Sequence, residues 1–91
     1  MADDDSLPEG LTFPCTLDIK IFLKTDPDNF SLVREVILKH VCINDLIRIS
    51  DKTSRGGRYQ SLSCRVKATN RQQMDNLYRG LTAHPEILMV I

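Results

Sequence analysis

The chain has 91 residues, of which 42 % are hydrophobic and 26 % charged, and its 12 cations balance its 12 acids. This length suits one domain with one core, and no run approaches the roughly 18 apolar residues that a membrane helix needs. Three cysteines do not predict a disulfide framework. We therefore expect a single domain in a reducing compartment. Because no basic and apolar leader opens the sequence, we expect that compartment to be the cytoplasm.

Residues 1–12 combine acids with proline and glycine and show no periodicity: Asp3, Asp4, Asp5, Pro8, Glu9 and Gly10. This composition predicts a disordered acidic tail before a single domain over residues 13–91. A first strand is predicted over about Thr16–Lys24, because apolar and polar residues alternate there. Its inner face would carry Leu17, Ile19, Ile21 and Leu23, which leaves the aromatic Phe22 among charged residues on the outer face.

A helix follows and is predicted to end near His40 or Val41. Asp28 or Asn29 can cap it by accepting hydrogen bonds from free backbone N–H groups. A stripe at helical spacing should face the sheet, made of Phe30, Val33, Val36, Ile37 and Val41. Lys39 and His40 would then lie in the last turn, where cations suit the helix dipole.

The next two strands are predicted as a hairpin, with Leu46–Lys52 pairing with the strand that follows Gly56-Gly57. A tight type I′ turn at the glycines would place Arg55 opposite Arg58. Ile49 would face Cys64 and Ile47 would face Val66, which puts both apolar sets on one side of the sheet. The same register sets Arg48 against Arg65 on the outer side, and Asp18 of the first strand or a bound anion would offset this repulsion.

A second helix opens at Asn70, which with Gln73 has the spacing of a capping box. Its buried stripe is predicted to be Met74, Leu77, Tyr78 and Leu81, and Pro85 follows its end. The nearly all-apolar segment Glu86–Ile91 predicts a last strand that is covered on both sides or held against a partner.

This order of elements predicts an α+β fold, the ferredoxin-like βαββαβ two-layer sandwich. Its four-stranded antiparallel sheet has the order 4-1-3-2, and both helices cover one face. The other sheet face is left without a helix. Any function of the sheet should therefore lie on that face or at the loops.

The zero net charge hides a division of the chain. Residues 48–71 hold seven cations and one acid, Asp51, whereas the rest of the chain holds five cations and 11 acids. A solvated hairpin is the simpler reading, and a basic face that attracts an acidic partner or an anion is the functional one. The candidate surface comprises Lys20, Phe22, Arg48, Arg58, Tyr59, Ser61, Arg65 and Lys67.

The sequence holds no pattern that points to catalysis, to a metal or to another cofactor. Cys64 should face the core, and neither His40 nor His84 is placed beside Cys15 or Cys42 to act as a base. We therefore expect no enzymatic activity. RNA binding is an alternative, because Phe22 and Tyr59 with nearby cations are similar to the stacking surface of RNA-recognition domains. Further rings would be expected at the positions that Ser61, Ser63 and Arg65 occupy, so nucleic acid is an unfavoured partner.

Several features together resemble the YbeD-like family of small bacterial proteins of unknown function. They are Phe13-Pro14, His40, the hairpin residues Ser54, Gly57, Tyr59 and Ser61, the helical Leu77-Tyr78 with Leu81, and the ending Met89-Val90-Ile91. The resemblance implies a cytoplasmic domain with a ferredoxin-like fold, similar to the regulatory ACT domains of amino-acid metabolism.

We expect a non-catalytic regulatory or adaptor domain that binds a protein partner, or itself as a homodimer, through the open sheet face or an edge. An amino-acid or carboxylate sensor is the second hypothesis, and no membrane association is expected.

Overall fold

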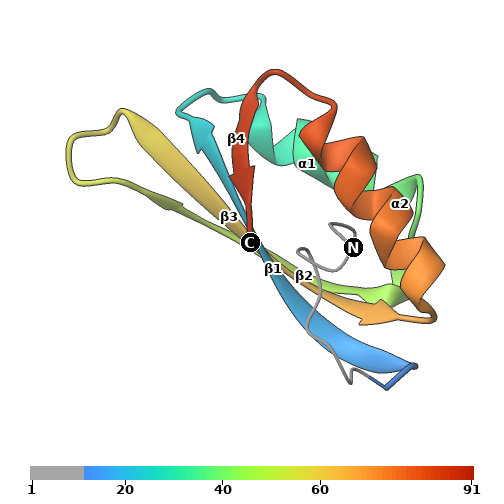
Figure 1. The fold of residues 1–91 in the computed structure, drawn as a ribbon. Coiled ribbons are helices and arrows are strands. Elements are labelled where there is room, and N and C mark those ends of the chain that lie inside the picture. The colour runs from blue at the N-terminus through green and yellow to red at the C-terminus, as the bar shows by residue number, and fades with distance from the viewer. Residues whose placement is uncertain (1–11) are drawn as a thin grey trace.

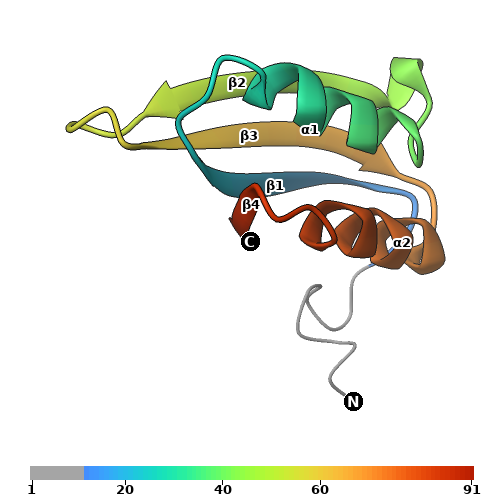
Figure 2. The ribbon, with the colours of Figure 1, turned by 90° about the horizontal axis from the view of Figure 1, so that it is seen from above.

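The computed structural model describes residues 12–91, so the predicted acidic tail lies almost wholly outside the described residues. Four strands form one sheet in the order β2-β3-β1-β4, and two helices cover one of its faces (Figures 1 and 2). The elements are β1 (Cys15–Lys24), α1 (Asn29–Leu38), the short 3-10 helix η2 (Ile43–Asp45), β2 (Leu46–Thr53), β3 (Tyr59–Ala68), α2 (Arg71–Thr82) and β4 (Ile87–Val90). This is the ferredoxin-like sandwich that the sequence predicted. No helix within residues 12–91 combines the length and the apolar character that a membrane crossing requires.

The core lies between the sheet and the helices. Alternate residues of β1 and β3 point into it, and the stripe predicted for α2 is buried. The side chains with the least exposure include Ile19, Ile21, Leu23, Leu62, Met74, Leu77 and Leu81. Asn70 caps α2 as predicted, because its Oδ1 accepts from the Gln73 N–H at 2.8 Å. Gln73 Oε1 in turn accepts from the Thr69 N–H at 2.7 Å. Side chains therefore satisfy two backbone N–H groups at the start of α2.

The predicted hairpin register is confirmed, but the predicted type I′ turn is wrong. Ile49 pairs with Cys64 and Arg48 with Arg65. The last backbone pair is Ser54 with Tyr59, and the connecting residues 55–58 form a longer loop in which the Gly57 N–H donates to the Ser54 carbonyl at 2.9 Å. Among the four loop residues, only Gly57 has a positive φ, of 77°. A loop with an even number of residues leaves the inward and outward positions of the two strands unchanged. The predicted register is therefore right although the predicted turn is wrong.

The predicted inner position of Ile47 is also wrong. The pairing of β2 shifts between Leu46 and Arg48, so that Leu46 rather than Ile47 lies opposite Val66. Ile47 is consequently 53 % exposed. A β-bulge inserts one extra residue into a strand and turns that strand away from its partner. Because of the bulge, Leu46 takes the position opposite Val66 that was predicted for Ile47.

The start of α1 differs from the prediction as well. Neither Asp28 nor Asn29 caps the helix through its side chain. Asn29 is buried instead, and its Nδ2 donates to the Lys24 carbonyl at 2.7 Å and to Gln60 Oε1 at 2.9 Å. Gln60 Nε2 continues the chain of hydrogen bonds by donating to Asp51 Oδ2 at 3.2 Å.

Phe30, which was predicted to face the sheet, is 40 % exposed. The helix ends at Leu38, so Lys39 is its C-cap and no basic residue lies in its last turn.

The last strand is covered on one side only. Ile87 is buried, whereas Leu88, Met89 and Ile91 are 52 %, 51 % and 61 % exposed. The strand is short, and a register shift interrupts its pairing with β1 between Phe22 and Leu23. Backbone bonds between Lys20 and Ile91, at 2.8 and 3.0 Å, continue the pairing to the end of the chain. Of the two predicted alternatives, coverage on both sides is therefore wrong within residues 12–91, and contact with a partner stays a prediction.

Replacing Gly57 by alanine should lower the free energy of unfolding by about 1 kcal/mol, because a Cβ disfavours a positive φ. A Cβ at this position would meet no atom within 4 Å, so the cost is conformational rather than steric. Gly56→Ala is the matched control, since Gly56 has the same open surroundings without a positive φ. Urea unfolding of both variants checks this. Equal midpoints for the two would contradict the assigned turn.

Replacing Asn29 by alanine should destabilise the fold by about 1–3 kcal/mol, because it leaves the Lys24 carbonyl and Gln60 Oε1 without their buried donor. Asn44→Ala, at an exposed position of η2, should change stability by less than about 0.5 kcal/mol. Chemical denaturation compares the two variants. A loss at Asn29 no larger than that at Asn44 would show that the buried hydrogen bonds add nothing.

Candidate functional site: the open sheet face

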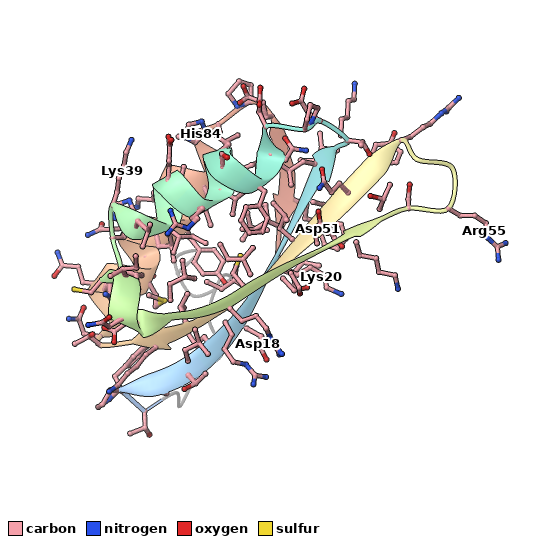
Figure 3. The ribbon with its side chains drawn as sticks, turned by 180° about the vertical axis from the view of Figure 1, so that it is seen from behind. Asp18, Lys20, Lys39, Asp51, Arg55 and His84 are labelled. Carbon is pink, nitrogen blue, oxygen red and sulfur yellow. The ribbon has the colours of Figure 1, made fainter. Side chains whose placement is uncertain are left out.

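The face of the sheet that carries no helix, here called the open face, is built from the outward residues of all four strands. The strand registers arrange these residues in rows across the sheet. One row runs Lys52, Ser61, Phe22, Met89 and the next runs Ser50, Ser63, Lys20, Ile91. Figure 3 shows Asp18 and Lys20 on the side of the sheet away from the helices.

Seven of the eight candidate residues lie together on the open face. They are Lys20 and Phe22 on β1, Arg48 on β2, and Tyr59, Ser61, Arg65 and Lys67 on β3. Arg58 does not belong to this group, because it lies in the hairpin loop, where its carbonyl accepts from the Thr25 N–H at 2.9 Å. The sequence had also left Met89 and Ile91 out of the surface. Their place depends on the β1–β4 register, which no local pattern reveals.

The opposed arginines are relieved as the sequence suggested. Asp18 of β1 lies opposite Arg65 of β3. The Asp18 carboxylate accepts from Arg65 Nε at 2.8 Å and from Arg65 Nη2 at 3.2 Å. This hydrogen bond, with the attraction of Arg65 and then Arg48, lowers the pKa of Asp18, although desolvation opposes the shift. The row Arg48, Arg65, Asp18 therefore holds two cations that share one acid.

The other cations of the open face have no such partner. Among residues 12–91, no ion pair engages Lys20, Lys52 or Lys67. Beside them lies a short apolar strip made of Phe22, Met89 and Ile91, and the latter two are about half exposed. A protein interface typically has an apolar centre within a polar rim. The open face offers this combination, with positive charge in the rim.

The outer end of the β2–β3 hairpin extends beyond the helices, and Arg55 lies at its tip (Figures 1 and 3). Two hollows meet there at Tyr59. The first, here called the hairpin pocket, has a volume of about 290 Å³. It is lined by Phe22, Lys52, Thr53, Ser54, Arg55, Tyr59, Gln60 and Ser61. The second, of about 450 Å³, is lined by Lys24, Thr25, Gly57, Arg58 and Tyr59. Tyr59 is 48 % exposed, so its ring is accessible.

A larger cleft, here called the α1 cleft, lies where β1 gives way to α1. Its volume is about 590 Å³ and its lining is Lys24, Thr25, Asp26, Asp28, Asn29, Leu32, Pro85, Glu86 and Leu88. Three carboxylates and one lysine line it, so its charge is opposite to that of the open face. Asp26 Oδ1 is already engaged by the Asp28 N–H at 2.8 Å.

The cysteines and histidines are not gathered into one site. Cys15, Cys42 and Cys64 are free thiols, and burial raises the pKa of Cys64 to about 12, which keeps it a neutral core residue. His84 lies 3.9 Å from a Glu86 oxygen through its Nδ1. Within the described part of the chain, no three His, Cys, Asp or Glu side chains are placed to hold a metal ion.

The depressed pKa of Asp18 predicts a pH-dependent contribution to stability. Its ionised form is favoured in the folded chain, so its contribution is fully present above the unfolded pKa of about 3.9 and is lost as the pH falls through the lower folded pKa. Asp18→Asn should therefore be less stable than the wild type at pH 7, and the difference should vanish in acid. Urea unfolding from pH 7 to pH 2 tests this. A difference that does not change with pH would rule out the ion pair as its cause.

Comparison with known proteins places the chain among small bacterial proteins. The UPF0250 protein of Paraburkholderia phymatum is 37 % identical over 81 residues, which cover 89 % of this chain and 91 % of that protein. The UPF0250 protein of Chromobacterium violaceum is 36 % identical over 87 residues, covering 96 % of this chain and 98 % of that protein.

Solved structures share the fold at low sequence identity. Protein HP0495 from H. pylori superimposes with a TM-score of 0.74 at 15 % identity, covering 97 % of this chain and 92 % of that one. The C-terminal domain of the MgtC protein from Mycobacterium tuberculosis gives a TM-score of 0.66 at 19 % identity, covering 93 % and 88 %. At such identities the likeness shows the fold alone.

The family described as "Protein of unknown function (DUF493)" matches residues 8–91. This match confirms the resemblance drawn from the sequence, and it begins upstream of Phe13, the first of the residues that carry that resemblance. With relatives above 30 % identity over nearly their whole length, the chain belongs to this family of bacterial proteins of unknown function.

Proposed function

We propose that the chain is a non-catalytic regulatory or adaptor domain that binds an acidic surface of a partner protein on its open face. The observation that carries this proposal is the set of cations without acidic partners around the apolar strip of Phe22, Met89 and Ile91. Desolvation of the strip would supply affinity, and the cations would select a negatively charged surface and speed the encounter.

Charge also argues against a second copy of the chain on this face. Two open faces brought together would set Lys20, Arg48 and Lys67 against the same cations of the other copy. Like charges across an interface cost several kcal/mol and suppress such pairs. A partner with carboxylates around an apolar patch meets no such repulsion.

The three free thiols are typical of a reducing compartment, so we propose that this binding takes place in the cytoplasm.

A charge-reversal experiment tests the proposal. The variant Arg48→Glu with Lys67→Glu changes the open face, and the matched control Arg34→Glu with Arg79→Glu changes two exposed cations of α1 and α2. Each tagged protein is used to capture partners from a lysate of its own organism. We expect an acidic protein bound by the wild type and by the control, lost about tenfold or more with the open-face variant, and released by added salt.

Two outcomes would contradict the proposal. One is the same set of partners with both variants. The other is binding of labelled single-stranded RNA by the wild type that the open-face variant loses, which would assign the cations to phosphate contacts. Urea unfolding of each variant confirms that any loss is not a loss of fold.

Small-molecule sensing is the second candidate, favoured by the α1 cleft. Its volume of about 590 Å³ is within the range of ligand pockets. Because Asp26, Asp28 and Glu86 line it, an amine would suit it better than a free carboxylate. A thermal-shift screen of amino acids, amines and carboxylates tests this, since a ligand at 100 times its dissociation constant stabilises by about 2.7 kcal/mol. Stabilisation by carboxylates alone would contradict the assigned charge preference.

A further inference from the structure

The hairpin pocket owes its shape to one small residue between larger ones. Ser61 lies between Lys52 on β2 and Phe22 on β1 in the same row, and Tyr59 is its neighbour along the outer side of β3. A serine among three long side chains leaves space beside them, and Ser61 is one of the residues that line the pocket of about 290 Å³. The pocket therefore follows from the register of three strands.

The residues that line the pocket differ in their chemistry. Phe22 and Tyr59 are diagonal neighbours on adjacent strands, a relation in which side chains lie about 7–8 Å apart. Their rings form the apolar walls of the pocket, with Phe22 half-buried and Tyr59 48 % exposed. Lys52 and Arg55 also line the pocket, and neither forms an ion pair with another residue of 12–91. This arrangement suits an apolar group with negative charge beside it.

We infer that the hairpin pocket receives one aromatic or branched apolar side chain from an acidic segment of a partner protein. This inference rests on the proposed function and names the part of the partner that would anchor it. The volume is at the lower limit of small-molecule pockets, so it is suited to one side chain rather than to a whole ligand. Buried anchors of this kind commonly dominate the energy of an interface. Acidic neighbours of the anchor would pair with Lys52 and Arg55.

A nucleic-acid base is the principal rival for the pocket. Bases stack on flat, exposed rings, and proteins that bind them place such rings side by side. Here the only small residue of the row separates Phe22 from Lys52, and Phe22 is half-buried at the edge of the depression. The pocket therefore presents one largely exposed ring, that of Tyr59, rather than two exposed rings side by side. This geometry favours a side chain.

Peptide probes test the inference on the full chain labelled with ¹⁵N. The probe carries a central phenylalanine between Asp and Glu residues, and two control peptides carry a central alanine or replace the acids by lysines. We expect only the first peptide to shift the backbone amides of Phe22, of residues 52–55 and of residues 59–61. Its dissociation constant should be about millimolar, as for a fragment of an interface.

A matched pair of variants locates the binding. Ser61→Leu fills the pocket and should abolish the amide shifts. Ser63→Leu makes the same change at the next outward position of β3, which does not line the pocket, and should leave the shifts in place. An absence of shifts with the first peptide would overturn the inference. Shifts confined to residues 25–29 would also overturn it, because they would assign the peptide to the α1 cleft.

Two further results separate this inference from the proposed function. If a captured partner is lost with the Arg48 and Lys67 reversals but is retained with Ser61→Leu, the open face binds that partner and the pocket is not its anchor. That result overturns the inference alone. Tighter binding of oligouridine than of the acidic peptide at residues 59–61 would overturn it in favour of nucleic acid.

Discussion

The alternation of β3 is the constraint on which the rest of the structure depends. This strand pairs with β1 over its full length and with β2 from Gln60 to Val66, so its side-chain parity fixes both neighbours at once. Every inward residue from Leu62 to Ala68 is buried, and a shift of one position would turn this set to water. The same parity sends Tyr59, Ser61 and Arg65 outward. The core and the candidate site are therefore two consequences of one register.

The open face combines features that a merely solvated surface does not require. Asp18 binds Arg65 through two hydrogen bonds and so relieves the repulsion that the register creates. The neighbouring cations are not relieved within residues 12–91, and an apolar strip that includes Met89 and Ile91 is left exposed beside them. Exposed apolar patches of this kind often mark an interaction site, and the neighbouring cations would suit a negatively charged partner. The α1 cleft has the opposite charge, so the two sites would select different ligands.

Buried polar groups connect the hairpin to the helical layer. Asn29 and Gln60 are the buried polar residues of the described core, and they form a chain of hydrogen bonds from the β1–α1 loop to Asp51 on β2. These hydrogen bonds join the first residue of α1 to β1, β3 and β2, so the network links the start of the helix to the sheet. It also lies between the α1 cleft and the base of the hairpin. Asn29 lines the α1 cleft and Gln60 lines the hairpin pocket, so the network joins the two candidate sites.

The sequence by itself determined the inward residues of β1 and β3, the stripe of α2 and the opposition of Arg48 to Arg65, because these follow from local periodicity. It determined the cap of α2 through the capping-box spacing, and the strand order through the order of the elements and the handedness of crossovers. It placed seven of eight candidate residues on one face for the same reason. Only the tertiary structure decided the bulge that exposes Ile47, the burial of Asn29 and the contribution of Met89 and Ile91 to the site. Each of these depends on which residues from distant segments meet in space. The local sequence of one strand or helix does not show which distant residues that element will contact.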